Sequence, residues 1–150
     1  MELTTVDVLV RIFVAIFIGG ILGLERSLAG KGAGIRTYAM VSLGSCIFSI
    51  ISLVGGVVGN PLYLGTAIIT GIGFIGAGLV LFQTESHRIT GITTAAGLWV
   101  SAGLGMTAGY GLFKLGVIAT VAALVIFTIF WFVERGLQRF SYKVEDTKNN

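Results

Sequence analysis

A long stretch without charge, residues 37–84, constrains this chain more than any other feature. Between Arg36 and Glu85 there is no Asp, Glu, Lys or Arg. Inside it, residues 70–78 read T-G-I-G-F-I-G-A-G, a glycine spacing that can cradle the pyrophosphate of a dinucleotide. A phosphate loop needs a preceding strand and water-facing amide groups, which this setting does not offer. The stretch instead predicts membrane-spanning helices that approach each other through glycine.

The composition agrees with a membrane protein. The chain is 55% hydrophobic and 11% charged, whereas soluble domains carry about 25% charged residues. Too little polar surface is left for water to solvate a compact globule. Strands of membrane barrels alternate polar and apolar residues over about ten positions, and these segments are apolar all round and longer. We therefore predict an all-α fold, a polytopic membrane helical bundle of about five transmembrane helices.

The expected spans follow from hydropathy and length. A transmembrane helix needs roughly 20 mostly apolar residues, and Pro61 divides the uncharged stretch into two such segments. The five expected spans are residues 7–24, 37–57, 62–82, 92–111 and 115–133. Residues 1–133 then form one transmembrane domain, and residues 134–150 form a short tail.

The basic residues predict the orientation. One side of the membrane has only Arg11 and Lys114. The other side has the rest: Arg26, Lys31, Arg36, Arg88, Arg135, Arg139, Lys143 and Lys148. Because basic residues concentrate in cytoplasmic loops, the N-terminus is expected outside and the C-terminus in the cytoplasm. Tyr38 and Trp131 are then expected at the inner interface, in an aromatic belt.

Small residues predict which helices touch. Gly, Ala and Ser mark contact faces of membrane helices because they let backbones approach closely. The candidate packing residues are Gly19 and Gly23 in the first span, Gly71, Gly73, Gly76 and Gly78 in the third, and Gly97, Ser101, Gly105 and Gly109 in the fourth. This places spans one, three and four at the centre of the bundle. The alternative is that glycine-interrupted helices line a transport pathway.

Few ionisable groups lie within the spans, where each costs about 2.5–3.5 kcal/mol on insertion scales. Asp7 and Arg11 share a helix face near the outer end and are expected to pair. A candidate functional cluster is expected at the cytoplasmic face: Glu25, Arg26, Arg36, Arg88, Thr93 and Thr94. A defined Glu25–Arg36–Arg88 network is one interpretation, and generic loop charge is the other. Thr93 or Thr94 is a candidate N-cap for the fourth helix.

The sequence offers no constellation for catalysis. It has no nucleophile paired with a base, no paired acidic residues in a span and no complete phosphate loop. The one cysteine, Cys46, and the one histidine, His87, predict neither a disulfide nor a metal site. We therefore expect no enzyme activity, no cofactor, no metal and no nucleic-acid partner.

Four motifs, in order, resemble the membrane domain of the MgtC/SapB family. They are residues 23–26 (G-L-E-R), 34–37 (G-I-R-T), 70–78 and 91–99 (G-I-T-T-A-A-G-L-W). The resemblance covers roughly residues 8–132 and implies a bacterial inner-membrane protein of about five spans. It also implies links to virulence, growth at low magnesium and inhibition of the F-type ATP synthase through its membrane sector.

Some positions depart from the pattern of the resemblance. Glu25 falls on the family's acidic position, but Thr93 stands where MgtC has an asparagine and Val100 where it has a cysteine. These departures suggest a branch other than the virulence proteins. Many family members continue into a soluble domain, so this chain is expected to be the membrane domain only.

The leading functional hypothesis is a non-enzymatic membrane protein surrounded by the lipid bilayer. It is expected to act through helix contacts with itself, as a homo-oligomer and most simply a dimer. Its second contact would be a membrane partner such as the ATP synthase membrane sector, in adaptation to low magnesium or intracellular stress. The alternative is a small ion or solute transporter or channel.

Overall fold

The computed structural model describes residues 3–54, 62–81 and 90–137, which form helices and no strand. The helices are α1 (Thr5–Leu28), α2 (Ile35–Val54), α3 (Leu62–Leu81), α4 (Ile92–Gly109) and α5 (Phe113–Val125). A π-helical turn, η2 (Ile126–Phe130), continues α5 without a break into a helix that ends at Leu137.

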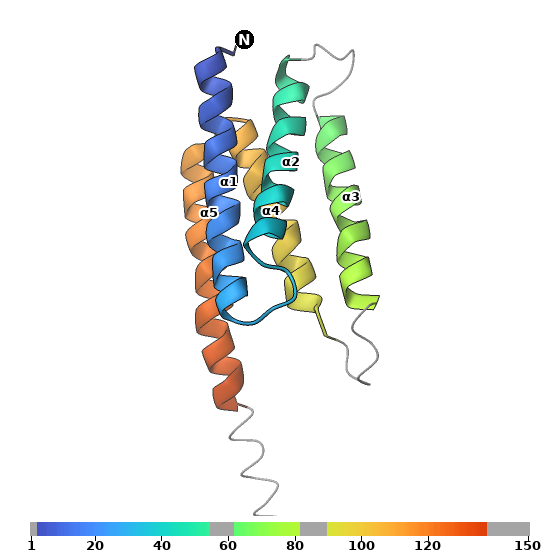
Figure 1. Ribbon diagram of the computed structural model, residues 1–150, viewed down its shortest axis with the longest axis vertical. Coiled ribbons are helices and arrows are strands. Elements are labelled where there is room, and N and C mark those ends of the chain that lie inside the picture. Colours follow the sequence, from blue (N-terminus) through green and yellow to red (C-terminus); the bar gives the residue numbers. More distant parts are fainter. Residues whose placement is uncertain (1–2, 55–61, 82–89, 138–150) are drawn as a thin grey trace, which may run out of the picture.

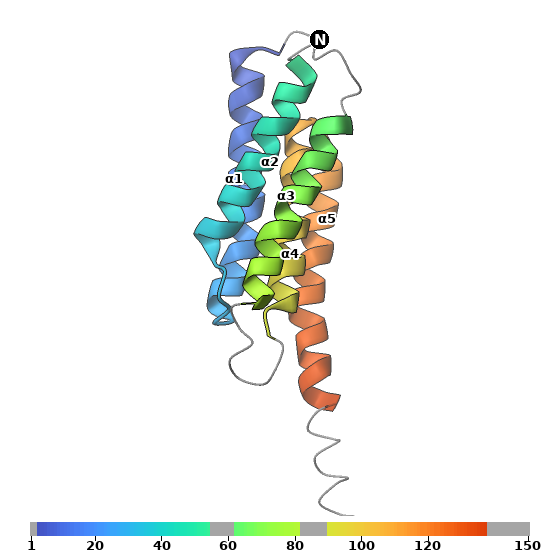
Figure 2. The same ribbon diagram turned by 90° about the vertical axis from the view of Figure 1, so that its right-hand side faces the viewer.

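The helices run alternately down and up (Figure 1). The turn between α1 and α2, the start of α4 and the end of α5 lie at one end of the bundle, here named the basic end. The start of α1 lies at the opposite end, as Figure 2 also shows. An odd number of crossings therefore places the two ends of the described chain on opposite sides.

Three helices are long and apolar enough to cross a membrane, namely Thr5–Leu28, Ile35–Val54 and Phe113–Leu137. A shorter apolar segment, Leu64–Val80, lies in α3. Helix α4 is rich in Gly, Ser and Thr, and it contacts all four other helices. Its neighbours cover about half of its residues, so it needs less apolar surface than a helix that faces lipid all round. The predicted all-α membrane bundle is confirmed.

The start of α1 differs from the expectation. Thr4 and Asp7 form a capping box, in which the Asp7 carboxylate accepts from the Thr4 amide (3.0 Å) and hydroxyl (2.7 Å). The expected Asp7–Arg11 ion pair is absent from the described residues. Arg11 is instead buried, and its guanidinium donates to the Gly109 carbonyl at the end of α4. The negative end of the α4 dipole favours a cation there.

The centre of the bundle consists of α1, α2 and α4, so the expectation that it holds spans one, three and four is wrong. A Cβ on Gly105 would lie 2.0 Å from the Ser42 carbonyl oxygen, and one on Gly109 would lie 2.5 Å from the Ser49 Cβ. A Cβ on Gly19 would lie 2.7 Å from the Ser42 Cβ. Glycines of α1 and α4 thus bring both helices close against α2.

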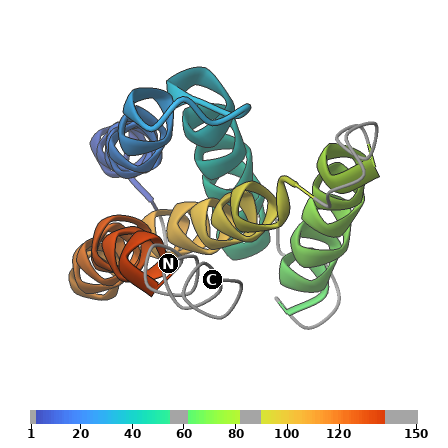
Figure 3. The ribbon, with the colours of Figure 1, turned by 90° about the horizontal axis from the view of Figure 1, so that it is seen from below.

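Helix α3 lies at the edge of the bundle, as the view from below shows (Figure 3). A Cβ on Gly71, Gly73 or Gly78 would meet no atom of the described residues within 4 Å, and Gly76 has only an ordinary contact at 3.4 Å to Ala95. Glycines of the third span therefore do not pack this helix into the centre of the bundle.

Helix α2 packs at the centre of the bundle with small serine side chains rather than glycines of its own. The Ser42 hydroxyl donates to the Ala15 carbonyl (2.7 Å), and the Ser101 hydroxyl of α4 donates to the Tyr38 carbonyl (2.8 Å). These side chains are small and buried, and their hydrogen bonds satisfy groups that lipid leaves unpaired. Tyr38 itself is 0% exposed, so its expected place in an interfacial belt is wrong.

Candidate functional site

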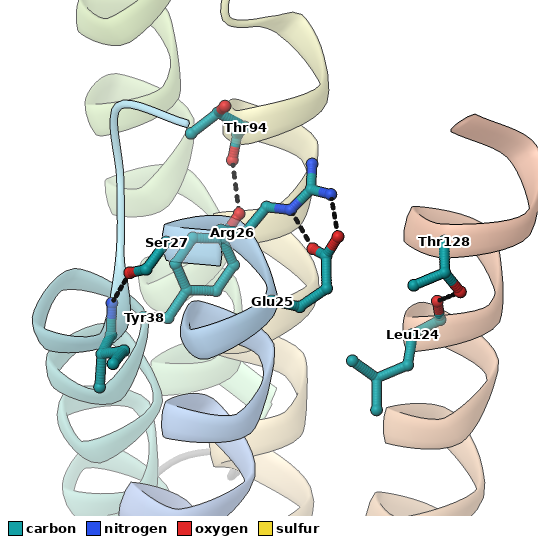
Figure 4. Close-up of polar contacts among 8 residues, drawn as sticks. Glu25, Arg26, Ser27, Tyr38, Thr94, Leu124 and Thr128 are labelled. Atoms are coloured by element: carbon teal, nitrogen blue, oxygen red, sulfur yellow. Dashed lines mark hydrogen bonds and ion pairs between the residues drawn. The ribbon is translucent and has the colours of Figure 1, made fainter. Parts of the chain in front are cut away.

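A group of buried polar and aromatic side chains lies at the basic end of the bundle. We call it the Arg26 cluster: Glu25, Arg26, Tyr38, Thr94 and Phe127. It draws on the end of α1, the start of α2, the start of α4 and the π-helical turn η2. Figure 4 shows the hydrogen-bonded members of the cluster together.

Arg26 is the charged centre of the cluster. Its Nε and Nη2 donate to the two carboxylate oxygens of Glu25, the second at 2.7 Å, so the adjacent side chains form a forked ion pair. The Arg26 side chain is 3% exposed and that of Glu25 17%. A charge-assisted, bidentate pair of this kind offsets part of the cost of taking a guanidinium out of water.

Phe127 covers one face of the guanidinium. The Arg26 Cζ lies 3.9 Å from the centroid of its ring, within the range of a cation–π contact. Phe127 lies in η2, and single π-helical turns inside an α-helix often occur at functional sites. The aromatic contact ties the end of α1 to the middle of the last helix.

Tyr38 connects the cluster to α4. Its hydroxyl donates to the Thr94 carbonyl at 3.3 Å (Figure 4). A Cβ on Gly97 would lie 2.3 Å from the Tyr38 Oη and 2.7 Å from the Phe127 Cζ. Gly97 therefore admits two aromatic side chains against the first turns of α4, and no larger residue fits without a shift.

A cavity of about 210 Å³ adjoins the cluster. Its charged and polar lining combines both signs, with Arg26, Lys31 and Glu134 beside Thr93 and Thr94. The N-cap of α4 is Gly91 (φ 89°), and no side chain makes a capping hydrogen bond there. Thr93 and Thr94 are thus not the cap, because the helix begins before them. The first amides of α4 point toward this end of the bundle, where they favour negative charge.

The four sequence motifs meet in this region. A Cβ on Gly23 would lie 2.6 Å from the Ile35 Cα, so the first two motifs touch where α1 turns into α2. The Ile35 amide also donates to the Ser27 hydroxyl at 3.2 Å. Gly76 brings the third motif against Ala95 of the fourth motif. Gly97 brings the fourth motif against Tyr38.

The structure separates the residues expected to form one cluster. Glu25, Arg26 and Thr94 come together, and Thr93 lines the adjoining cavity. Arg36 is exposed at the start of α2, and Glu25 pairs with the adjacent Arg26 rather than with Arg36. Arg88 lies outside the described residues. In the network interpretation, the Glu25–Arg36 link is therefore wrong, because Glu25 pairs with the adjacent Arg26 at the end of α1.

Sequence reasoning missed Tyr38, Phe127, Lys31 and Glu134. Tyr38 had a usable signal, since it repeats with Ser42, Ser45 and Ser49 at helical spacing along α2. Phe127 had none, because it stands in a run of aromatic and aliphatic residues of the last span. Within that run only the fold distinguishes it.

The Arg26 cluster connects four helical segments through polar and aromatic contacts. It holds the end of α1 and the starts of α2 and α4 to the last helix with one buried ion pair, one cation–π contact and one hydrogen bond. Removing one partner of a buried pair is costly, about 3–5 kcal/mol, because it leaves an uncompensated charge. The Arg26 cluster therefore stabilises the arrangement of the helices at this end.

A helical bundle with these spans and a buried ion pair at one end defines a polytopic membrane protein. A sequence profile of the MgtC family matches residues 12–136. The chain belongs to the MgtC family, which confirms the resemblance read from the four motifs.

Three bacterial relatives show how far the similarity extends. A protein of Escherichia coli (strain K12), named "Putative magnesium transporter YhiD", is 35% identical over 97% of this chain and 71% of its own length. Protein SapB of Bacillus subtilis (strain 168) is 37% identical over 62% of this chain and 43% of its own. Protein MgtC of Brucella abortus (strain 2308) is 35% identical over 75% and 46%. The chain thus spans about half of SapB and of MgtC. No solved structure matches this chain.

Proposed function

We propose that this chain is a non-enzymatic protein of the bacterial inner membrane that acts through helix contacts, with a second copy of itself and with a membrane partner. One observation carries the proposal. In α1 and α4, Gly19, Gly23, Gly97, Gly105 and Gly109 pack against other parts of the bundle, whereas Gly71, Gly73 and Gly78 of α3 face no atom of another described segment within 4 Å.

The contact face lies where α3 and α4 meet. Gly73 and Ala77, four residues apart, line an apolar groove with Ala96 and Trp99. A pair of small residues at this spacing lets a second helix approach closely in lipid. A homodimer through this face is the simplest arrangement, and a helix of another membrane complex fits the same groove by the same packing.

The orientation and the partner belong to the same proposal. The basic end, with Arg26, Lys31 and Arg36, faces the cytoplasm by the positive-inside rule, which leaves the start of α1 outside. The family resemblance supports the F-type ATP synthase membrane sector as partner and low magnesium or intracellular stress as the setting.

Oxidative cross-linking tests the contact face. In a Cys46→Ala background, Ala77→Cys is expected to form a disulfide-linked dimer in native membrane vesicles, and Gly73→Leu is expected to lower its yield severalfold. Gly20→Leu is the matched control, because a Cβ there also meets nothing within 4 Å but lies on α1. No dimer, or equal loss from both leucines, contradicts the proposal. A tagged chain with Gly73→Leu is also expected to lose its partner from membrane pull-downs.

Transport is the second candidate, and the name of the YhiD relative favours it. Against cation transport, buried arginines lie toward both ends of the described bundle, Arg11 at the Gly109 carbonyl and Arg26 in the last turn of α1. Buried positive charge raises the cost of a passing Mg²⁺. The described residues also hold no group of three metal-ligating side chains. Magnesium flux into proteoliposomes that Glu25→Gln abolishes would favour transport and overturn the contact model.

A further inference from the structure

We propose that the cavity beside the Arg26 cluster binds the headgroup of a phospholipid that carries an ammonium group, of the phosphatidylethanolamine type. The phosphate lies against Arg26 and Thr94, and the ammonium faces Glu134. This site is separate from the helix-contact face, which lies between α3 and α4. Three observations carry the proposal: buried donors that open into the cavity, unpaired charges of both signs at its rim, and a hydrocarbon wall.

The floor of the cavity consists of its two buried polar side chains, Arg26 (3% exposed) and Thr94 (5% exposed). Arg26 uses Nε and Nη2 for Glu25, and its third nitrogen, Nη1, points away from that carboxylate (Figure 4). Neither this Nη1 nor the Thr94 hydroxyl has a hydrogen-bond partner among the described residues. In the described part of the chain, every fully enclosed side-chain nitrogen or oxygen has a partner. The Arg26 Nη1 and the Thr94 hydroxyl are therefore open, and the cavity that both residues line is the space they reach.

The donors at the floor suit an oxyanion. A guanidinium nitrogen only donates hydrogen bonds, and the Thr94 hydroxyl is able to donate as well. The amides of Ile92 and Thr93 belong to the first turn of α4, where amides have no partner inside the helix and the dipole favours an anion. Lys31 adds a second cation to the lining, and it makes no ion pair within the described ranges. A phosphate offers several acceptor oxygens to these donors.

Glu134 disfavours a ligand that is anionic throughout. It lines the same cavity, and like Lys31 it has no ion-pair partner in the parts of the chain that the structure describes. Glu134 follows Phe127, the ring under Arg26, by seven residues, or about 10 Å along a helix. The last helix runs toward the basic end (Figure 1), so Glu134 lies on the aqueous side of the floor. In phosphatidylethanolamine the ammonium also lies beyond the phosphate, on the side away from the acyl chains.

The remaining wall of the cavity is hydrocarbon and favours a lipid over a water-soluble molecule with the same headgroup. Ile126, Phe130 and Trp131 form this wall. Ile126 is 51% exposed and Phe130 is 57% exposed, so the wall continues onto the lipid-facing surface of the last helix. Tryptophan is also common at the level of lipid headgroups. An acyl chain is able to follow this wall, whereas a free aminophosphate has no group to place against it.

The cavity is large enough for a headgroup and its waters but not for a whole lipid. Its volume is about 210 Å³, and on the same measure one water needs about 10–15 Å³. The charges at the rim then set the selectivity between lipids. Phosphatidylglycerol has hydroxyl groups in place of the ammonium, so it gains nothing from Glu134. One exposed ion pair corresponds to a preference of about two- to fivefold.

Native mass spectrometry of the purified chain with added lipid tests the rim. The probes are phosphatidylethanolamine and phosphatidylglycerol with identical acyl chains. The wild type is expected to retain about two- to fivefold more phosphatidylethanolamine. Glu134→Gln is expected to remove this preference, and Lys31→Gln to lower the retention of both lipids. Arg36→Gln is the control, because Arg36 is an exposed cation of the same end that does not line the cavity, and it is expected to change neither.

A second set of variants tests the floor. Thr94→Val removes the open hydroxyl at nearly constant volume and is expected to lower the retention of both lipids severalfold, while Thr94→Ser restores it. Thr70→Val is the matched control, because the Thr70 hydroxyl lies on α3 and donates to the Thr66 carbonyl. Lys31 and Glu134 are exposed, so their variants keep the proposal testable if Thr94→Val does not fold.

Several outcomes overturn the proposal. They are equal retention of the two lipids by the wild type, a preference that survives Glu134→Gln, and full retention by a folded Thr94→Val. Free phosphoethanolamine in excess is expected to leave the bound lipid in place, and displacement would overturn the assignment to a lipid. Glu134→Gln should leave the Ala77→Cys cross-link unchanged, so failure of this site is distinguishable from failure of the contact face.

Discussion

The guanidinium of Arg26 stacks on the ring of Phe127, with 3.9 Å between the Arg26 Cζ and the ring centroid, although the two residues belong to the first and last helices. Arg26 is also paired with Glu25, so its guanidinium has a carboxylate in its plane and an aromatic ring on one face. This arrangement makes the cluster sensitive to which partner is removed.

The first prediction concerns the balance of charge in the cluster. Glu25→Gln should destabilise the protein by roughly 3–5 kcal/mol, because it leaves the buried Arg26 unpaired. The double variant Glu25→Gln with Arg26→Met should be less destabilised than Glu25→Gln alone, since no buried charge remains. Thermal unfolding in detergent measures the order. A double variant that melts below Glu25→Gln would contradict this account of the pair.

The second prediction compares two neighbouring glycines of α4. Gly105→Ala should destabilise by about 1–3 kcal/mol, because its Cβ would lie 2.0 Å from the Ser42 carbonyl oxygen and force α2 and α4 apart. Gly103→Ala should be neutral or slightly stabilising, because its Cβ meets nothing within 4 Å and alanine favours the helix. Melting temperatures of the two variants, side by side, check this contrast. Equal effects would mean that α4 does not pack on α2 as described.

The third prediction is a rescue within the cluster. Gly97→Ala should destabilise strongly, because its Cβ would lie 2.3 Å from the Tyr38 Oη. Tyr38→Phe alone should cost about 0.5–1.5 kcal/mol through the lost hydrogen bond to Thr94. Combined, the two substitutions should be less harmful than their sum, since removing the hydroxyl relieves the closest contact. Strict additivity in a double-mutant cycle would show that the two residues do not meet.

The fourth prediction concerns the turn between α4 and α5. Gly111 has φ 76°, a conformation that residues with a Cβ rarely adopt, and its Cβ would lie 3.2 Å from the Arg11 Nη2. Gly111→Ala should therefore destabilise by about 1–2 kcal/mol. Gly20→Ala, in open space on α1, should not. Unfolding measured on both proteins tests this, and a neutral Gly111→Ala would contradict the turn geometry.

Much of the fold was predictable, because the bilayer imposes simple requirements. Hydropathy and the distribution of Arg and Lys gave helices, their approximate bounds and an odd number of crossings. Glu25 and Arg26 were candidates from the sequence because two charged residues end an apolar run, and in the structure their side chains form an ion pair. The mutual pairing of these residues was not predictable, because sequence neighbours on a helix do not usually face each other.

The sequence by itself determined the class of protein, because lipid accepts only segments whose backbone polar groups are bonded internally. Tertiary structure alone decided which helix is central. Glycine stripes in α1, α3 and α4 look alike in sequence, yet those of α1 and α4 press against α2 while Gly71, Gly73 and Gly78 of α3 remain open. A small residue indicates that another helix is able to approach the backbone closely, but it does not show which helix does so. The serines of α2 and the ring of Phe127 supply those partners only once the helices are placed side by side.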